Sequence, residues 1–170
     1  MSVITRTDVP VSWRVPAVGP CSCFQLRKAT RAVTAFYDKY LHPAGVSITQ
    51  YAILVNVARA DGITRTALSH RLGMDRTTLT RNLVPLERGQ LLSEAAGEDR
   101  RQKLIRLSPA GLLRVEECFP LWEQAQSAFV LAYGTENAAA LASLLQQAAR
   151  AVTPDPGPDA PSPSPDTPAQ

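Results

Sequence analysis

Two cysteines, Cys21 and Cys23, lie one residue apart and just before positive charge. Ser22-x-x-Gln25 has the spacing of a capping box, in which an N-cap serine and a glutamine three residues later close the start of a helix. It predicts that Cys23 occupies the first helical position, where unpaired N–H groups and the helix dipole favour a thiolate. Arg27 adds positive charge one turn along. We therefore expect Cys23 to be more acidic than an ordinary thiol, with Cys21 just outside the helix.

Three interpretations of these thiols stay open on the sequence. Free cysteine packs as a small apolar residue, so Cys23 could be buried. It could instead be a redox switch, in which oxidation to a sulfenate or a disulfide moves other parts of the protein. Third, Cys21 and Cys23, with Cys118 as a further ligand, could bind a soft ion such as arsenite. A single Cys-x-Cys lacks the two separated pairs of stronger zinc motifs, so we predict no firm metal site and no cofactor.

The middle of the chain offers a different chemistry, that of charge. Between Thr64 and Arg106 there are nine Lys or Arg and five Asp or Glu, whereas the whole chain of 170 residues carries only +3. A basic segment in a nearly neutral chain indicates a polyanionic partner. Double-stranded DNA is the partner that we expect.

The elements that must position these residues are mainly helical. Apolar residues at helical spacing predict a first helix that ends at residues 42–45 and a second that ends near 61–62. Two short helices follow, capped by Thr64 and Asp75 and separated by a turn at Gly73. Strands at 91–95 and 103–107 flank a charged turn, and two further helices follow Ser108. Helix, turn, helix and basic hairpin form the layout of a winged helix-turn-helix, so the fold class is mainly α with a small β-wing.

The second short helix has two faces. Leu79, Leu83 and Leu86 fall on one side and predict a buried face. The opposite side and its flanks carry hydroxyls and guanidinium groups, which suit the major groove: Thr77, Thr80, Arg81 and Arg88. Pro85 removes a backbone hydrogen bond, so we expect a kink or an early end of the helix there.

Charged residues also mark the tip of the hairpin. Arg100 and Arg101 on a narrow β-turn suit the minor groove of DNA, where the potential is most negative. Asp99 can pair with a neighbouring arginine and orient it. We therefore expect Asp99, Arg100 and Arg101 to belong to the DNA-binding surface.

Several motifs in order resemble the MarR family of bacterial transcriptional regulators. They are LHPAGVSITQYAIL, then GITRTALSHRLGMDRTTLTRNLVPLERGQLL, then GEDRRQKLIRLSPAGL. The resemblance covers about residues 21–150. It implies a homodimer whose first and last helices interlock and whose two lobes bind a pseudo-palindromic operator. It also implies DNA-binding roles for one set of residues on the recognition helix and another on the wing: Asp75, Arg76, Thr77, Thr80 and Arg81, then Asp99 and Arg101.

The start of the first helix is similar to one branch of that family. Cys23-Phe24-x-Leu26 and Arg31 resemble the organic-peroxide sensors, whose reactive cysteine matches Cys23. The resemblance implies that Tyr37 is one of two tyrosines that hold the thiolate, while Ile48 occupies the position of the other. It implies that Cys118 is a resolving partner across the dimer. Many family members instead bind aromatic acids, so a small-molecule effector is a second expectation.

The expected organisation has three parts. Residues 1–20 form an extended arm, and residues 151–170, with seven of the fourteen prolines, form a disordered tail. Between them, 21–60 and 108–150 supply dimerisation helices and 63–107 the DNA-binding lobe. No stretch approaches the roughly 18 apolar residues of a membrane span, and no signal peptide is evident, so a cytoplasmic location without a membrane is expected.

These observations predict a homodimeric repressor that an effector releases from DNA, either through oxidation of Cys23 or through a small molecule. Regulation by arsenite or a soft metal at Cys21 and Cys23 is an alternative. A winged-helix protein-interaction module is another, against which the exposed arginines Arg81, Arg88, Arg100 and Arg101 argue. The sequence has no Cys-x-x-Cys in a strand–helix unit, no Ser/His/Asp set and no phosphate loop, so we do not expect an enzyme.

Overall fold

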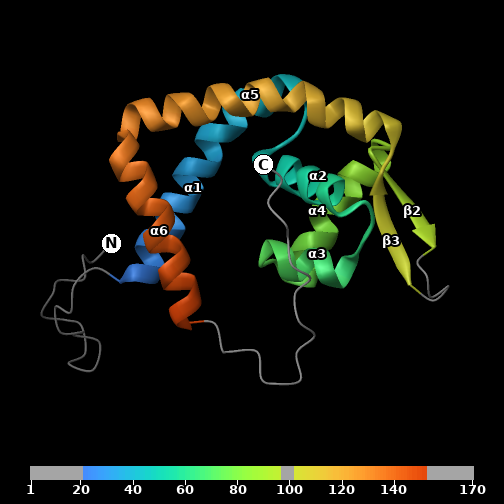
Figure 1. The fold of residues 1–170 in the computed structure, drawn as a ribbon, viewed down its shortest axis with the longest axis horizontal. Coiled ribbons are helices and arrows are strands. Elements are labelled where there is room, and N and C mark those ends of the chain that lie inside the picture. Colours follow the sequence, from blue (N-terminus) through green and yellow to red (C-terminus); the bar gives the residue numbers. More distant parts are fainter. Residues whose placement is uncertain (1–20, 97–101, 153–170) are drawn as a thin grey trace, which may run out of the picture. The chain divides into compact units, whose positions relative to one another are not determined.

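The computed structural model describes residues 21–96 and 102–152 (Figure 1). The chain is mainly helical with a small antiparallel sheet, which confirms the predicted fold class. It forms two compact units, divided after Gln126, within the long helix α5. In chain order the elements are α1 (Ser22–Leu41), the 3-10 helix η2 (His42–Ala44), α2 (Ile48–Ala60), β1 (Ile63–Thr64), α3 (Arg65–Leu72), α4 (Arg76–Arg88), β2 (Leu92–Ala96), β3 (Lys103–Leu107), α5 (Pro109–Tyr133) and α6 (Thr135–Val152).

The sheet has three strands in the order β1-β3-β2, all antiparallel. β3 has the predicted bounds and β2 begins one residue later than predicted. β1 was not predicted, because two residues are too short to show an alternating pattern. Its Ile63 pairs with Ile105 of β3, so the wing is joined to the segment that precedes α3.

Local capping chemistry defines the two short helices, as predicted. The Thr64 hydroxyl accepts from the Ala67 N–H at 3.1 Å and begins α3. Gly73 ends α3 with φ +60°, a conformation that favours glycine. Asp75 then begins α4 by accepting from the Thr78 N–H at 2.9 Å. The tight turn between α3 and α4 is therefore encoded by its own residues.

α4 continues through Pro85 to Arg88, so the expected early end of the helix is wrong. Leu83 and Leu86, on either side of the proline, are 0% and 1% exposed. Tertiary packing of an apolar face supplies most of the stability of such a helix, and here it outweighs the hydrogen bond that Pro85 removes.

One apolar core lies among α2, α3, α4 and the sheet, and we call the part of the molecule around it the winged lobe. Its apolar side chains come from all of these elements: Ile53, Leu54, Val57, Ile63, Leu68, Leu79, Leu83, Leu86, Leu91, Leu92 and Ile105. Burial of this set fixes which face of α4 points inward and which is left to solvent.

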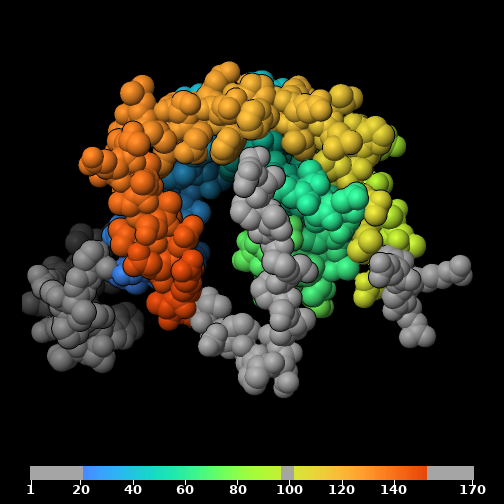
Figure 2. Space-filling model, in the orientation of Figure 1, coloured from blue at the N-terminus to red at the C-terminus, as the bar shows by residue number. Residues whose placement is uncertain are grey.

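A second apolar cluster packs the end of α1, η2 and α2 against the first half of α5. It consists of Leu41, Ala44, Val46, Tyr51 and Cys118. Arg114 of α5 donates a hydrogen bond to the Ala44 carbonyl. In Figure 2 the first part of α5, in yellow, lies against the green surface of the lobe.

The predicted capping box at Ser22 and Gln25 is wrong. α1 begins one residue earlier, with Cys21 at the N-cap and no side-chain cap, and the Cys21 carbonyl accepts from the Gln25 N–H at 3.0 Å. Cys23 is therefore the second helical residue. A true capping box starts α2 instead, where Ser47 and Gln50 bond each other's backbone N–H groups.

None of the helices in the described ranges, taken alone, combines the length and the low polarity that a membrane span requires. α5 and α6 reach that length and composition only when taken together as a broken pair.

Candidate nucleic-acid interface

The exposed face of α4 carries the polar residues that the sequence assigned to it. Leu79, Leu83 and Leu86 are buried, which confirms the predicted inner face. The predicted DNA-contacting side chains of this helix are all exposed: Arg76, Thr77, Thr80, Arg81 and Arg88. A face of this kind presents three guanidinium groups and two hydroxyls over three helical turns, a set of groups that can bind phosphates and base edges.

Asp75 positions the start of this helix. One carboxylate oxygen accepts from the Thr78 N–H at 2.9 Å and the other from the Thr78 hydroxyl at 2.6 Å. These bonds, the side-chain bond first, lower the pKa of Asp75 below its ordinary value. The carboxylate is thus ionised and committed to the cap, and its contribution to the surface is to fix where α4 begins.

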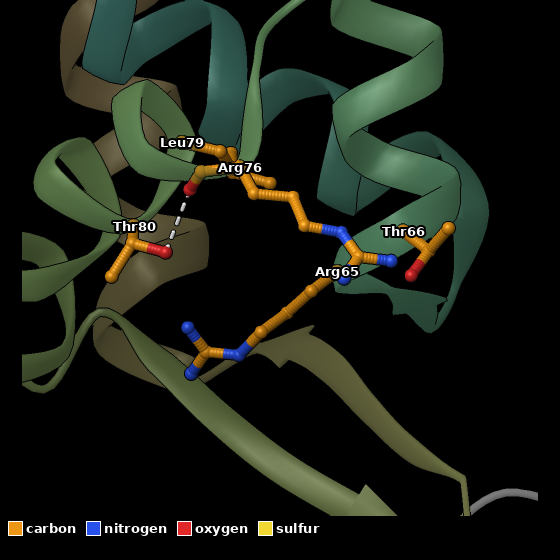
Figure 3. A pocket seen from close by; sticks show the side chains of 5 residues that line it. All are labelled: Arg65, Thr66, Arg76, Leu79 and Thr80. Carbon is orange, nitrogen blue, oxygen red and sulfur yellow. Dashed lines mark hydrogen bonds between the residues drawn. The ribbon is translucent and has the colours of Figure 1, made fainter.

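A hollow of about 220 Å³ lies between α3 and α4 (Figure 3). It is lined by Arg65, Thr66, Arg76, Leu79 and Thr80. In the close-up, Arg76 extends from α4 towards Thr66 of α3. The Thr80 hydroxyl donates to the Arg76 carbonyl at 2.8 Å, which leaves its oxygen lone pairs and methyl group as the outward features. The Arg76 guanidinium beside the Thr66 hydroxyl suits a phosphate oxygen, because both groups can donate hydrogen bonds to it.

Ion pairs separate the cations of the lobe into two classes. Arg65 lies 2.6 Å from Glu87 and 3.5 Å from Glu94, and Lys103 lies 2.9 Å from Glu94. The Lys103 ammonium, followed by Arg65, lowers the pKa of Glu94. Elsewhere on α3 and α4, four arginines form no ion pair with any residue that the structure describes: Arg71, Arg76, Arg81 and Arg88. The uncompensated positive charge of the described lobe therefore lies mostly on α4.

The predicted wing-tip residues, Asp99, Arg100 and Arg101, lie outside the described residues. The strands that lead to them are placed, with Ala96 of β2 opposite Lys103 of β3.

The three cysteines differ in burial. Cys21 and Cys23 are exposed, whereas Cys118 is fully buried in the second apolar cluster, with residues of α1, η2 and α2. Burial raises the pKa of Cys118 to about 11. Such a thiol is protonated and shielded, which does not suit the resolving role that the family resemblance implied. No group of three metal-ligating side chains occurs among the described residues, so Cys21, Cys23 and Cys118 do not meet there.

Tyr37 does not reach Cys23 within one chain. Both residues belong to α1, where fourteen residues correspond to about 21 Å along the helix. The Tyr37 hydroxyl instead donates to the Gln126 side chain of α5 at 2.6 Å, and burial raises its pKa. A contact between Tyr37 and the Cys23 thiol would therefore need a second copy of the chain.

The sequence did not reveal a second hollow, of about 330 Å³, between α2 and the first half of α5. Its walls are mostly apolar and aromatic, with an amide and a guanidinium among them: Ile48, Tyr51, Ala52, Val55, Asn56, Arg59, Val115, Phe119 and Trp122. The Phe119 and Trp122 rings stack with centroids 6.2 Å apart. That Phe119 and Trp122 face α2 follows only from the fold.

Comparison with known proteins gives one consistent result. A model of the MarR family matches residues 44–102. The transcriptional regulator MosR of M. tuberculosis, solved in complex with DNA, is 32% identical, with 79% of this chain and 100% of that chain covered and a TM-score of 0.66. A MarR mutant from E. coli complexed with operator DNA is 22% identical, with 74% of this chain and 91% of that chain covered and a TM-score of 0.67. YwoH of Bacillus subtilis, an uncharacterized HTH-type transcriptional regulator, is 25% identical over 93 residues, which are 55% of this chain and 68% of YwoH.

Proposed function

This chain belongs to the MarR family of winged-helix transcriptional regulators, and we propose that it represses transcription by binding duplex DNA through α4. The observation that carries the proposal is the exposed face of α4, whose arginines pair with no acidic residue in the described part of the chain and lie opposite a buried leucine face. The DNA complex of MosR, a relative that this chain covers completely, supports the same mode of binding. Family members are generally not enzymes, and no catalytic role is proposed.

The side chains of α4 divide into two roles by reach and chemistry. Arg81, with Thr77 and Thr80, contacts base edges, because a guanidinium can form two hydrogen bonds with guanine and a threonine methyl can contact thymine. Arg76 and Arg88, near the two ends of the helix, hold the phosphate backbone. The wing tip, with Asp99, Arg100 and Arg101, is proposed to enter the minor groove next to them.

The active species is proposed to be a homodimer. Every residue from 21 to 32 is exposed, including Phe24 at 58% and Leu26 at 43%. α6 has no buried residue in the single chain, and its Leu144 is 61% exposed. Large apolar side chains exposed together on two helices are typical of a surface that packs against a partner. A second copy supplies one and places two winged lobes on a pseudo-palindromic operator.

Release from DNA is proposed to follow one of two effectors. Cys23 and Cys21 are exposed in the single chain, and the first proposed effector is an organic peroxide or, in the alternative form, arsenite that reacts with them. The α2–α5 hollow offers stacked aromatic rings and the Arg59 guanidinium, which suit an aromatic acid. Both sites lie outside α4. Either effector is therefore proposed to act by changing the relative orientation of the two winged lobes in the dimer.

A duplex selected from a random library by the wild-type protein tests the function. Fluorescence anisotropy should show salt-sensitive binding to the selected duplex and weaker binding to a scrambled one. If the Cys23 thiol is the sensor, organic peroxide should release the wild-type protein from the duplex but not Cys23→Ser. If the α2–α5 hollow is the effector site, an aromatic acid should release both proteins. Equal, salt-insensitive binding to both duplexes would contradict the proposal and favour a protein-interaction module.

A further inference from the structure

We propose that Glu94 of β2 restrains nonspecific DNA binding by holding Lys103 and Arg65 away from the phosphate backbone. The inference rests on the DNA binding proposed above. It adds a specificity-determining residue that acts through its negative charge on two cations of the lobe, rather than through a contact with a base.

The geometry places one carboxylate against cations of two elements. Glu94 Oε2 accepts from Lys103 Nζ at 2.9 Å, and its Oε1 lies 3.5 Å from Arg65 Nη2. Ala96 lies opposite Lys103, and Glu94 is two residues before Ala96, so Glu94 and Lys103 form a diagonal pair on one face of the hairpin. The same Nη2 of Arg65, the first residue of α3, lies 2.6 Å from Glu87 Oε1, so Glu87 holds this arginine more closely than Glu94 does.

These pairs matter because cations act on DNA without regard to sequence. Each Lys or Arg that contacts a phosphate releases counterions from any duplex, and nonspecific binding consists almost entirely of this effect. A freed Lys103 or Arg65 would therefore strengthen every nonspecific complex. The complex with the selected duplex gains less, since base contacts of α4 hold the lobe in one register. The charge of Glu94, which pairs mainly with Lys103 while Glu87 pairs with Arg65, thus preserves the difference in affinity between the specific and the nonspecific complex.

The relevant side chains can be changed without unfolding the protein. The Lys103 side chain is 79% exposed and that of Glu94 is 46% exposed. Exposed ion pairs contribute little to folding stability, so Glu94→Gln should fold. Glutamine keeps the length and the hydrogen-bonding capacity of the side chain and removes only its charge.

The experiment compares Glu94→Gln with Glu116→Gln. Glu116 is exposed on α5 and forms no ion pair with other residues in the described ranges, so the control has the same change in net charge. Anisotropy titrations use a random-sequence duplex at salt concentrations from about 50 to 300 mM. We expect Glu94→Gln to steepen the slope of log K against log salt by about 0.9 per subunit, because Lys103 is freed while Glu87 still holds Arg65, and to tighten binding about three- to tenfold near 0.1 M salt. The selected duplex should gain less, and Glu116→Gln should match wild type on both.

Lys103→Gln supplies the second arm. In the wild-type background it should change the salt slope little, because Lys103 is already paired with Glu94. In the Glu94→Gln background it should reverse part of the increase in affinity and in salt slope. Identical behaviour of Glu94→Gln and Glu116→Gln would overturn the inference. So would a slope lowered by about 0.9 in Lys103→Gln alone, because Lys103 would then contact phosphate in the wild type. Both results leave the proposed function intact, whereas absence of duplex binding by the wild type would overturn both proposals.

Discussion

At the scale of single residues, Cys118 differs from the other cysteines because the core encloses its thiol. It is 0% exposed, and burial raises its pKa to about 11. Since the thiolate is the reactive form, Cys118 should be inert in the folded protein. We predict that a Cys21→Ser/Cys23→Ser variant gives no fast reaction with a chromogenic thiol reagent at about pH 8 and one full equivalent in denaturant. Fast native labelling of that variant would show that Cys118 is accessible and would restore its candidacy as a resolving thiol.

Asp75 gives a prediction about pH at the same scale. Hydrogen bonds from Thr78 lower its pKa in the folded state below the ordinary value of 3.8. A lowered folded pKa means that the stabilisation is fully present above the unfolded pKa and is lost as pH falls through the folded value. Asp75→Asn keeps a capping oxygen without the charge. Urea midpoints should therefore be higher for wild type than for Asp75→Asn near neutral pH, and the difference should vanish in acid. A difference independent of pH would contradict the role of the charge.

At the scale of elements, Gly111 allows α5 to pack against the loop before β2. A Cβ at this position would lie 2.1 Å from the Leu91 carbonyl oxygen, and Leu91 also accepts from the Ser108 N–H at 3.1 Å. Alanine normally stabilises a helix more than glycine does. Because of the close contact with Leu91, we nevertheless predict that Gly111→Ala destabilises the fold by about 1–3 kcal/mol. Chemical denaturation measures the change, with Ala110→Ser, an exposed neighbour, as the control. A stabilised Gly111→Ala would mean that the two elements do not pack this closely.

The elements that the sequence predicted well are those that local chemistry determines. Thr64 and Asp75 cap their helices through neighbouring N–H groups, and the leucines of α4 keep a strict helical period. β1 escaped prediction because it exists only through its pairing with β3. The same holds for the α2–α5 hollow and for the Arg65–Glu87–Glu94–Lys103 ion pairs, whose partners come from different elements. At α1, serine and glutamine had the right spacing, but the helix begins at Ser22 itself.

At the scale of the whole molecule, the apolar residues left exposed on α1 and α6 predict a dimer. Phe24→Asp places a charge on the 58% exposed apolar position of α1. We expect light scattering after size exclusion to give half the mass of wild type, and DNA affinity to fall because one lobe binds alone. Ala67→Asp is the control for the mass measurement, since Ala67 is exposed on α3, outside the ranges 21–60 and 108–150 that are expected to supply the dimerisation helices. A wild-type protein of monomeric mass would contradict the proposed assembly.

The central claim is that α4 reads bases with Arg81 and holds the backbone with Arg88. The most direct measurement is the affinity of wild type, Arg81→Gln and Arg88→Gln for the selected duplex and for each of its single-base variants. We expect Arg81→Gln to lose discrimination, by about 1–3 kcal/mol, at one base pair in each half-site. Arg88→Gln should weaken all duplexes alike and lower the salt slope by about 0.9. If Arg81→Gln instead keeps the wild-type base preferences, α4 is not the element that reads the operator.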